Sequence, residues 1–152
     1  MTLCLDRDAA GRMATAKAIE NASRSSSSPA LLVVDPDDLT PGKDPDDAVR
    51  DLGAEGFARL LGTRRCAVTW RALEFARDLS GNTEVVGRRK ALERAGSWLG
   101  SLPPRLALEQ EDAVTAVASR CGYSPEAATR AYRARYWAEP RRSLASTLDR
   151  GL

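Results

Sequence analysis

The chain has 152 residues, of which 43% are hydrophobic and 29% are charged, and its formal net charge is +2 at pH 7. This balance is typical of a soluble globular protein, and no apolar run reaches the length of a membrane-spanning helix. Histidine is absent and the three cysteines lie far apart, which excludes the usual Cys/His zinc sites and argues against a disulfide framework. The first residues lack a signal-peptide pattern, so we expect a cytoplasmic protein without a membrane partner.

Two short apolar runs, residues 3–5 and 30–34, predict buried strands of a parallel sheet. Between them, residues 9–24 are rich in alanine and carry apolar side chains at helical spacing. This order of strand, helix and strand is the unit from which parallel sheets are built. Charge is uneven along the chain, because acid dominates residues 35–51 and arginine dominates residues 128–142.

The segment after the second predicted strand starts with an acidic, turn-rich loop over residues 36–45. Pro45 and the acidic residues after it favour the first turn of a helix. We expect Gly53 and Gly56 to separate this short helix from a second one that ends near Leu61.

From Trp70 onward the apolar spacing is helical almost throughout, with a predicted break at residues 100–104 and a helix from Ser124 to about Tyr136. The fold class predicted is therefore α/β, a partial parallel sheet flanked by helices, followed by an all-α helical subdomain. The expected parts are an α/β part over residues 1–68, a helical subdomain over 69–138 and a flexible tail over 139–152.

Four carboxylates, those of Asp6, Asp8, Asp44 and Asp46, follow the two predicted strands. The carboxyl ends of parallel strands meet at one edge of a sheet, so these side chains are expected to converge there. Carboxylates without His or Cys partners favour Mg²⁺ or Mn²⁺. The alternative is a solvated acidic loop, and the similar string over residues 35–38 shows how readily such a pattern arises.

Residues 5–12, Leu-Asp-Arg-Asp-Ala-Ala-Gly-Arg, resemble the Asp-Gly-Asp-x-Ala-Gly segment of Toprim domains in bacterial replicative DNA primases. Residues 42–47, Gly-Lys-Asp-Pro-Asp-Asp, resemble the Lys-Asp-Pro-Asp that follows the next strand there, and residues 53–57 are similar to the usual continuation. The resemblance covers about residues 3–62 and extends more loosely to the helices beyond. It implies the second half of a Toprim domain and the helical subdomain of a primase.

The resemblance also implies roles for individual residues. The four aspartates would bind the divalent metals that activate a nucleoside triphosphate for RNA primer synthesis on single-stranded DNA. Arg7 replaces a glycine of the family, where it either contacts phosphate or crowds the site, and Lys43 is a second candidate for contact with phosphate.

The family's upstream strand and its catalytic glutamate have no counterpart before Asp6, so the catalytic residue is unknown. Three explanations stay open: a truncated or mis-started reading frame, a split enzyme completed by a separate chain, or a degenerate relative. The first is favoured, because loss of those strands would expose a sheet edge. DNA primase-type nucleotidyl transfer would then require the missing half, and a replicative helicase is a further candidate partner.

Residues 111–136 have the outline of a helix-turn-helix, with Arg130, Arg133 and Arg135 on the second helix as candidate DNA contacts. An ordinary antiparallel helix pair needs the same turn and is the favoured interpretation. Residues 88–90, Arg-Arg-Lys, are similarly interpreted as a solvated helix face rather than a phosphate contact. The few tryptophans and tyrosines are expected to pack in the core.

Three functions compete. A primase-related protein would bind metal through the two Asp pairs in DNA replication. A non-catalytic DNA-binding or regulatory module using residues 111–136 would keep its DNA binding in EDTA and without Asp44. A Toprim nuclease would use the same Asp-x-Asp pair, but the Lys-Asp-Pro-Asp segment and the helices favour the primase.

Overall fold

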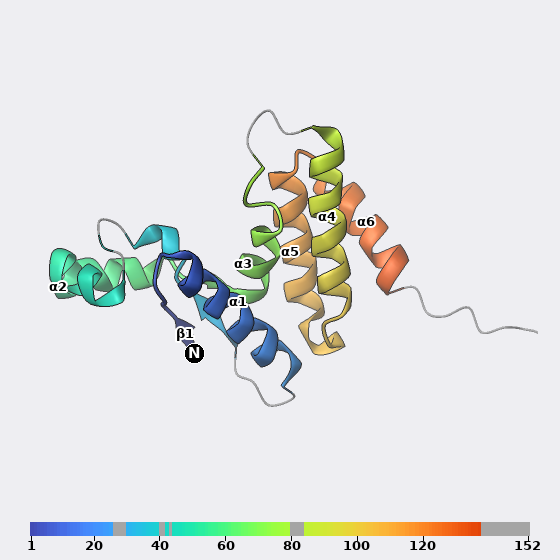
Figure 1. Ribbon diagram of the computed structural model, residues 1–152. Helices are drawn as coiled ribbons and strands as arrows, with labels where there is room; N and C mark the ends of the chain where they lie inside the picture. The colour runs from blue at the N-terminus through green and yellow to red at the C-terminus, as the bar shows by residue number, and fades with distance from the viewer. Residues whose placement is uncertain (26–29, 40–41, 43, 80–83, 138–152) are drawn as a thin grey trace, which may run out of the picture.

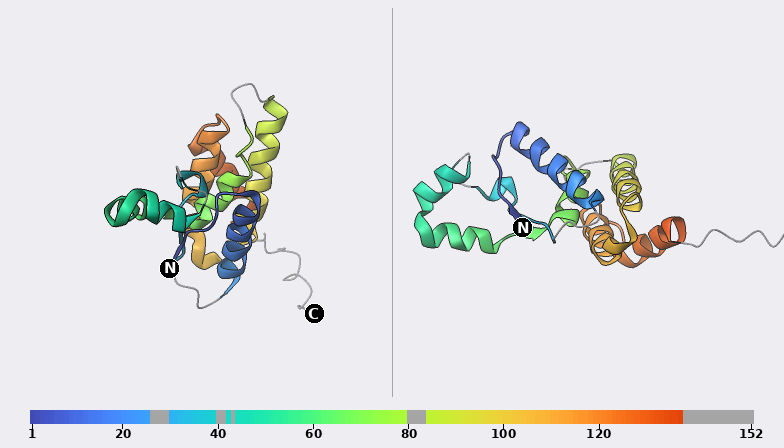
Figure 2. Two further views of the ribbon diagram at one scale, coloured as in Figure 1. Left: turned by 60° about the vertical axis from the view of Figure 1, so that its left-hand side comes forward. Right: turned by 90° about the horizontal axis from the view of Figure 1, so that it is seen from below.

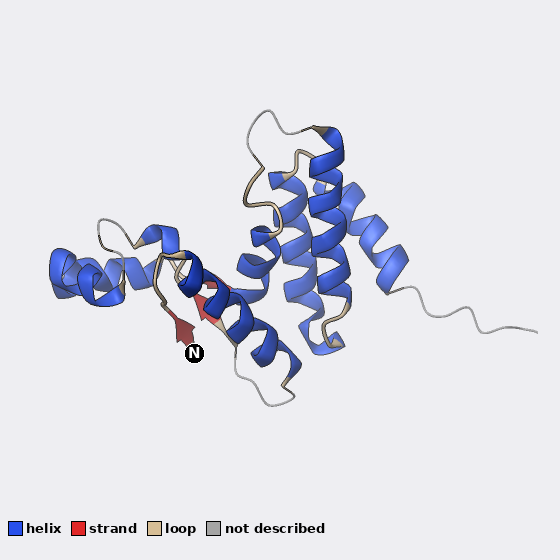
Figure 3. Ribbon diagram, in the orientation of Figure 1, coloured by secondary structure: helices blue, strands red, loops and turns tan. Residues whose placement is uncertain are grey.

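The computed structural model describes residues 1–25, 30–39, 42, 44–79 and 84–137. Helices dominate it, with a small sheet toward the amino terminus (Figures 1 and 3). In chain order the elements are β1 (Thr2–Leu3), α1 (Ala9–Arg24), β2 (Leu32–Val33), η1 (Pro36–Asp38), α2 (Pro45–Gly62), β3 (Arg65–Cys66), α3 (Ala67–Glu74), α4 (Val85–Gly100), η2 (Pro104–Leu106), α5 (Ala107–Arg120) and α6 (Pro125–Tyr136).

The sheet has the order β1-β2-β3 and is mixed. β1 and β2 are parallel, with Leu3 opposite Val33, which confirms the expected strand-helix-strand unit. β3 is antiparallel to β2 and was missed, so the prediction of a purely parallel sheet is wrong. β3 has only two residues and runs directly into α3, which leaves no alternation to detect.

The two faces of β2 are covered by different helices. Val33 is fully buried in a cluster with Ile19 of α1 and Trp70 of α3, whereas Val34 is buried with Leu39 and residues of α2. Successive side chains of an extended segment point to opposite faces, so this division follows from the backbone. The α/β prediction is therefore correct at the level of a small sheet with helices on both faces.

The first two long helices begin where the sequence predicts. α1 spans the predicted residues 9–24. α2 begins at Pro45 and is bent at Gly53, whose φ of 66° is left-handed (Figure 2, right). Gly56 lies inside the second helical segment, so the expectation that it helps to separate the helices is wrong. Of these two glycines, only Gly53 has the left-handed backbone conformation that favours glycine.

Helices α3 to α6 form the second part of the molecule (Figure 1). They share one large apolar core. α4 ends at Gly100 and α6 begins after the Ser124 cap, as expected. A side chain at Gly100 would collide with the Tyr136 ring, so glycine lets this ring of α6 lie against α4.

The expected part boundary after residue 68 falls inside α3, which contacts α1, β2 and β3 as well as α4 and α5. The expected tail over residues 139–152 lies outside the described residues. In the part of the chain that the structure describes, no helix combines the length and apolar character of a membrane span.

Candidate functional site

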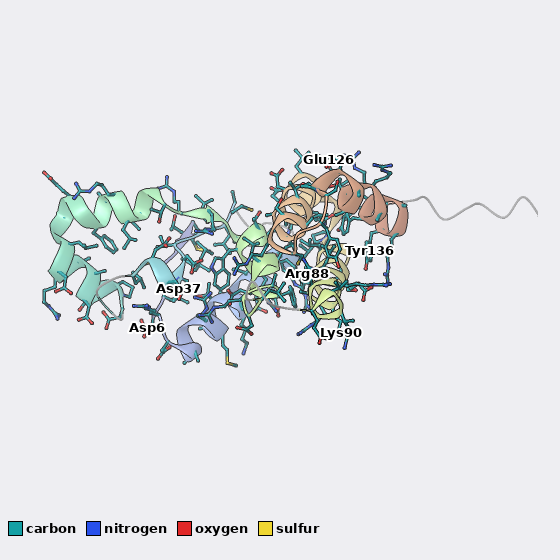
Figure 4. All side chains as sticks on the ribbon, turned by 90° about the horizontal axis from the view of Figure 1, so that it is seen from above. Asp6, Asp37, Arg88, Lys90, Glu126 and Tyr136 are labelled. Carbon is teal, nitrogen blue, oxygen red and sulfur yellow. The ribbon has the colours of Figure 1, made fainter. Side chains whose placement is uncertain are left out.

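Acidic side chains gather at the edge of the sheet where β1 and β2 end. Because the two strands are parallel, the loop with Asp6 and Asp8 and the turn with Asp35 leave the same edge. Figure 4 shows the labelled Asp6 and Asp37 toward this end of the molecule, away from the helical part. We call this edge, together with the start of α2, the carboxylate edge; its candidate metal ligands are Asp6, Asp8, Asp44 and Asp46.

The loop after β1 is held at the start of α1. The Asp8 carboxylate accepts a hydrogen bond from the Gly11 backbone N–H at 2.7 Å, which makes Asp8 the N-cap of α1. A side chain at Gly11 would collide with the Asp6 carbonyl, so the loop folds closely onto the helix only with glycine here. Asp6, Arg7 and Asp8 are all exposed. The loop after β1 therefore leaves the side chains of Asp6 and Asp8 accessible to solvent.

The second aspartate pair lies at the start of α2. Asp44 is the N-cap of this helix, and its carboxylate accepts a hydrogen bond from the Asp47 backbone N–H at 2.8 Å. Pro45 occupies the first helical position, and Asp46 is exposed in the first turn. Lys43, predicted to contact phosphate, lies outside the described residues.

A second group of carboxylates surrounds the buried guanidinium of Arg12. Arg12 Nη2 lies 2.5 Å from Glu74 Oε1, and Nη1 lies 3.0 Å from Asp37 Oδ1 and 3.4 Å from Asp35 Oδ1. Burial alone would lower the pKa of Arg12, but the hydrogen bond and charge of Glu74 and the charges of Asp37 and Asp35 outweigh it and raise the pKa. Arg12 therefore stays charged and forms ion pairs with all three carboxylates.

Two exposed arginines complete this group. Arg77 lies 3.6 Å from Asp37, and Arg65 lies about 4 Å from both Asp35 and Asp38. We name the seven residues the Arg12 cluster: Arg12, Asp35, Asp37, Asp38, Arg65, Glu74 and Arg77.

Sequence reasoning missed the Arg12 cluster, because it treated residues 35–38 as a solvated string. One signal was available. Arg12 lies three residues before Thr15 and seven before Ile19 and so shares their helix face, and all three are buried. An arginine on a buried helix face requires an anionic partner.

The predicted metal ligands form no such pairs. Among the described residues, no arginine or lysine forms an ion pair with Asp6, Asp8, Asp44 or Asp46. The structure also does not gather all four into one cage, since no group of three or more Asp, Glu, Cys or His side chains suited to a metal occurs within the described ranges. Each pair nevertheless keeps an oxygen-only donor set, which suits Mg²⁺.

The helix pair α5 and α6 has the predicted turn and cap, and all three candidate DNA-contacting arginines are exposed. They differ in their partners. Arg133 donates two hydrogen bonds to the Glu111 carboxylate of α5, from Nε at 2.5 Å and from Nη2 at 2.6 Å. Arg135 instead stacks on the Tyr136 ring, and Arg130 has no carboxylate within ion-pair distance among the residues described.

The aromatic side chains mostly pack, as expected. Trp70 and Tyr132 are buried, and Tyr132 contacts the rings of Tyr136 and Trp137. Within the predicted basic run at the start of α4, Arg89 pairs with Glu93. The Arg88 Nε atom is buried and has no hydrogen-bond partner among the described residues. The prediction that residues 88–90 form a solvated face is therefore incomplete.

Comparisons of the chain with protein-family models, with curated proteins and with solved structures find no match. Function therefore has to be inferred from the chemistry of the side chains. The carboxylate edge offers the exposed Asp6, Asp8 and Asp46 and the partly exposed Asp44, and no cation of the described residues forms an ion pair with them. The helical part offers exposed arginines and partly exposed aromatic rings.

Proposed function

We propose that the chain is a primase-related Toprim protein whose carboxylate edge binds Mg²⁺ or Mn²⁺ and a nucleoside triphosphate for RNA primer synthesis in DNA replication. One observation carries the proposal: the acidic groups at this edge fall into two sets. Arg12 forms ion pairs with Asp35, Asp37 and Glu74, whereas no cation of the described residues pairs with the aspartates that resemble Toprim ligands. A divalent cation would supply the missing positive charge.

The donor set fits this role even without a closed cage. Mg²⁺ is usually held by one or two carboxylates and completes its shell with water and substrate phosphates. In the proposal Asp6 with Asp8, and Asp44 with Asp46, hold such metals. When bound, the metals would offset negative charge during phosphoryl transfer.

In the proposal, hydrogen bonds within the chain position the carboxylates that hold the metals. Capping fixes one oxygen of Asp8 and one of Asp44 on a backbone N–H, which restricts where the remaining oxygens can lie. The exposed Arg7 is proposed to contact phosphate, together with Lys43. No catalytic residue is assigned among the residues of this chain.

Binding of a fluorescent nucleoside triphosphate analogue, followed by anisotropy, tests the proposal. We expect binding in Mg²⁺ that EDTA reverses and that Asp8→Asn weakens about tenfold or more, since asparagine keeps the cap but removes the charge. Asp112→Asn, which removes an exposed charge from α5, is the matched control and should change nothing. Binding that survives both EDTA and Asp8→Asn would contradict the proposal.

A second candidate is a non-catalytic DNA-binding or regulatory module that uses α5 and α6. The observed turn between these helices and the exposed Arg130 favour it. It predicts DNA binding that persists in EDTA and in Asp44→Asn. Cleavage of DNA in Mn²⁺ would instead favour a Toprim nuclease.

A further inference from the structure

A basic groove lies on the side of the helical part away from α6's amino end. Its volume is about 550 Å³, and α3, α4 and α6 supply its walls. Figure 4 shows Lys90 on the opposite side of the helices from Glu126, the residue at the start of α6. Its principal lining residues are Phe75, Lys90, Glu93, Arg94, Trp98 and Arg135.

The cations of this groove lack anionic partners. Within the described ranges, no carboxylate forms an ion pair with Lys90, Arg94 or Arg135. The acidic residue of the groove, Glu93, is already bound to Arg89 at 2.8 Å. The groove therefore carries an excess of positive charge that the described residues do not neutralise.

Aromatic rings hold two of the arginines in place. The Arg94 guanidinium carbon lies 5.5 Å from the centre of the Phe75 ring, and that of Arg135 lies 5.3 Å from the Tyr136 ring. A guanidinium that stacks on a ring keeps its N–H groups free for hydrogen bonds. Because stacking restricts the side chain beforehand, less entropy is lost when an anion binds.

We propose that this groove binds the phosphate backbone of single-stranded nucleic acid. Proteins that bind single strands combine a cationic track with aromatic surfaces on which bases stack, and the half-buried Trp98 lies among the cations here. Duplex bases are stacked on each other and cannot reach such a ring. Of the arginines on α6 that the sequence suggested as DNA contacts, the inference keeps Arg135 and leaves out Arg133, which is bound to Glu111. It does not depend on metal binding.

The test is anisotropy of a labelled oligothymidylate of about 12 nucleotides, within the usual site size, in EDTA. The triple variant Lys90→Gln/Arg94→Gln/Arg135→Gln removes three phosphate contacts and should weaken binding about a hundredfold at about 0.1 M salt. The matched control Lys17→Gln/Arg24→Gln/Arg59→Gln removes the same charge from exposed sites on α1 and α2 and should bind like the unchanged protein.

Salt dependence sharpens the result. Three contacts predict a slope of log affinity against log salt near −2, or about a twentyfold loss between about 50 and 200 mM, and the triple variant should lose most of this slope. Equal binding by both variants, or no binding by the unchanged protein, would overturn the proposal. Equal competition by inorganic phosphate would reveal a site for small anions only, and equal competition by polyglutamate would point to an acidic protein. Either result would overturn it as well.

Discussion

Different interactions stabilise the two parts of this molecule. Helices α3 to α6 share a single large cluster of buried apolar side chains, with Leu99 and Val117 fully buried. The α/β part has two small apolar clusters, one on each face of β2. Ion pairs around Arg12 and N-caps at Asp8 and Asp44 add to them.

This difference shows where each kind of substitution should act. A substitution that changes the volume of a side chain should affect stability most in the helical part, because close-packed cores relax only partly around a cavity. A change of charge should matter most at the carboxylate edge, where the side chains are polar and partly exposed. Function is accordingly expected where the polar groups remain unpaired.

The largest effect should come from Leu99→Ala in the helical core. Leu99 is fully buried, so the substitution leaves a cavity and should lower the free energy of unfolding by about 3 to 5 kcal/mol. Urea denaturation measures it. Leu108→Ala, at a residue that is 77% exposed on α5, should cost no more than about 0.5 kcal/mol. Equal costs at the two sites would show that the helical part is not held by this core.

Arg12→Met should have the next largest effect, about 2 to 4 kcal/mol in the same measurement, because it leaves neighbouring carboxylates without their cation. Arg77→Met, at an exposed pair with Asp37, should cost less than about 1 kcal/mol. Adding Glu74→Gln to Arg12→Met should recover part of the loss, since it removes one unpaired charge. Absence of recovery would contradict the electrostatic explanation.

Substitution of the N-cap residues should have a smaller effect on stability. This effect should depend on the loss of the cap hydrogen bond and not on the loss of the negative charge. Asp8→Ala and Asp44→Ala should each lower the free energy of unfolding by about 1 kcal/mol, because a backbone N–H loses its partner. The corresponding asparagine variants should lower the free energy of unfolding by only about a few tenths of a kcal/mol. Thermal unfolding measures both, and an equal loss for alanine and asparagine would show that the negative charge matters more than the cap.

The smallest effect concerns the exposed pair of Glu111 and Arg133. The hydrogen bond from Arg133, followed by its charge, holds the pKa of Glu111 below its ordinary value of 4.5. The stability gained from the pair is therefore present above the pKa of the unfolded chain and is lost as pH falls through the lower folded pKa. NMR titration should show that Arg133→Gln raises the pKa of Glu111 and that Arg130→Gln does not.

Local signals in the sequence were sufficient for the helix ends. Asp8 before α1, Pro45 in α2 and Ser124 before α6 act within three residues of themselves, so their effects could be read from the chain. The Arg12 pairs could not, because Arg12 and Glu74 are 62 residues apart and only the fold brings them together. The same limit applied to β3, which pairs through two residues with a distant strand.

The predicted site shows the same division. The strand-end positions of Asp6 and Asp8 followed from the parallel unit, and the start of α2 followed from Pro45 and the acidic residues after it. How far these pairs approach one another depends on how α2 lies against the sheet, which no local pattern specifies. The basic groove escaped detection for the same reason, since Arg94 and Arg135 come from different helices.

The most direct test of the proposed function is a Mn²⁺ titration followed by EPR, with the unchanged protein beside Asp6→Asn/Asp44→Asn. Both substitutions remove a negative charge, and asparagine preserves the cap at Asp44, so the double variant should keep the fold. An unchanged thermal unfolding transition would confirm this. We predict that the unchanged protein binds Mn²⁺ and that the double variant binds it at least about tenfold more weakly. Equal Mn²⁺ binding by the two proteins, or none by either, would contradict a metal site at the carboxylate edge.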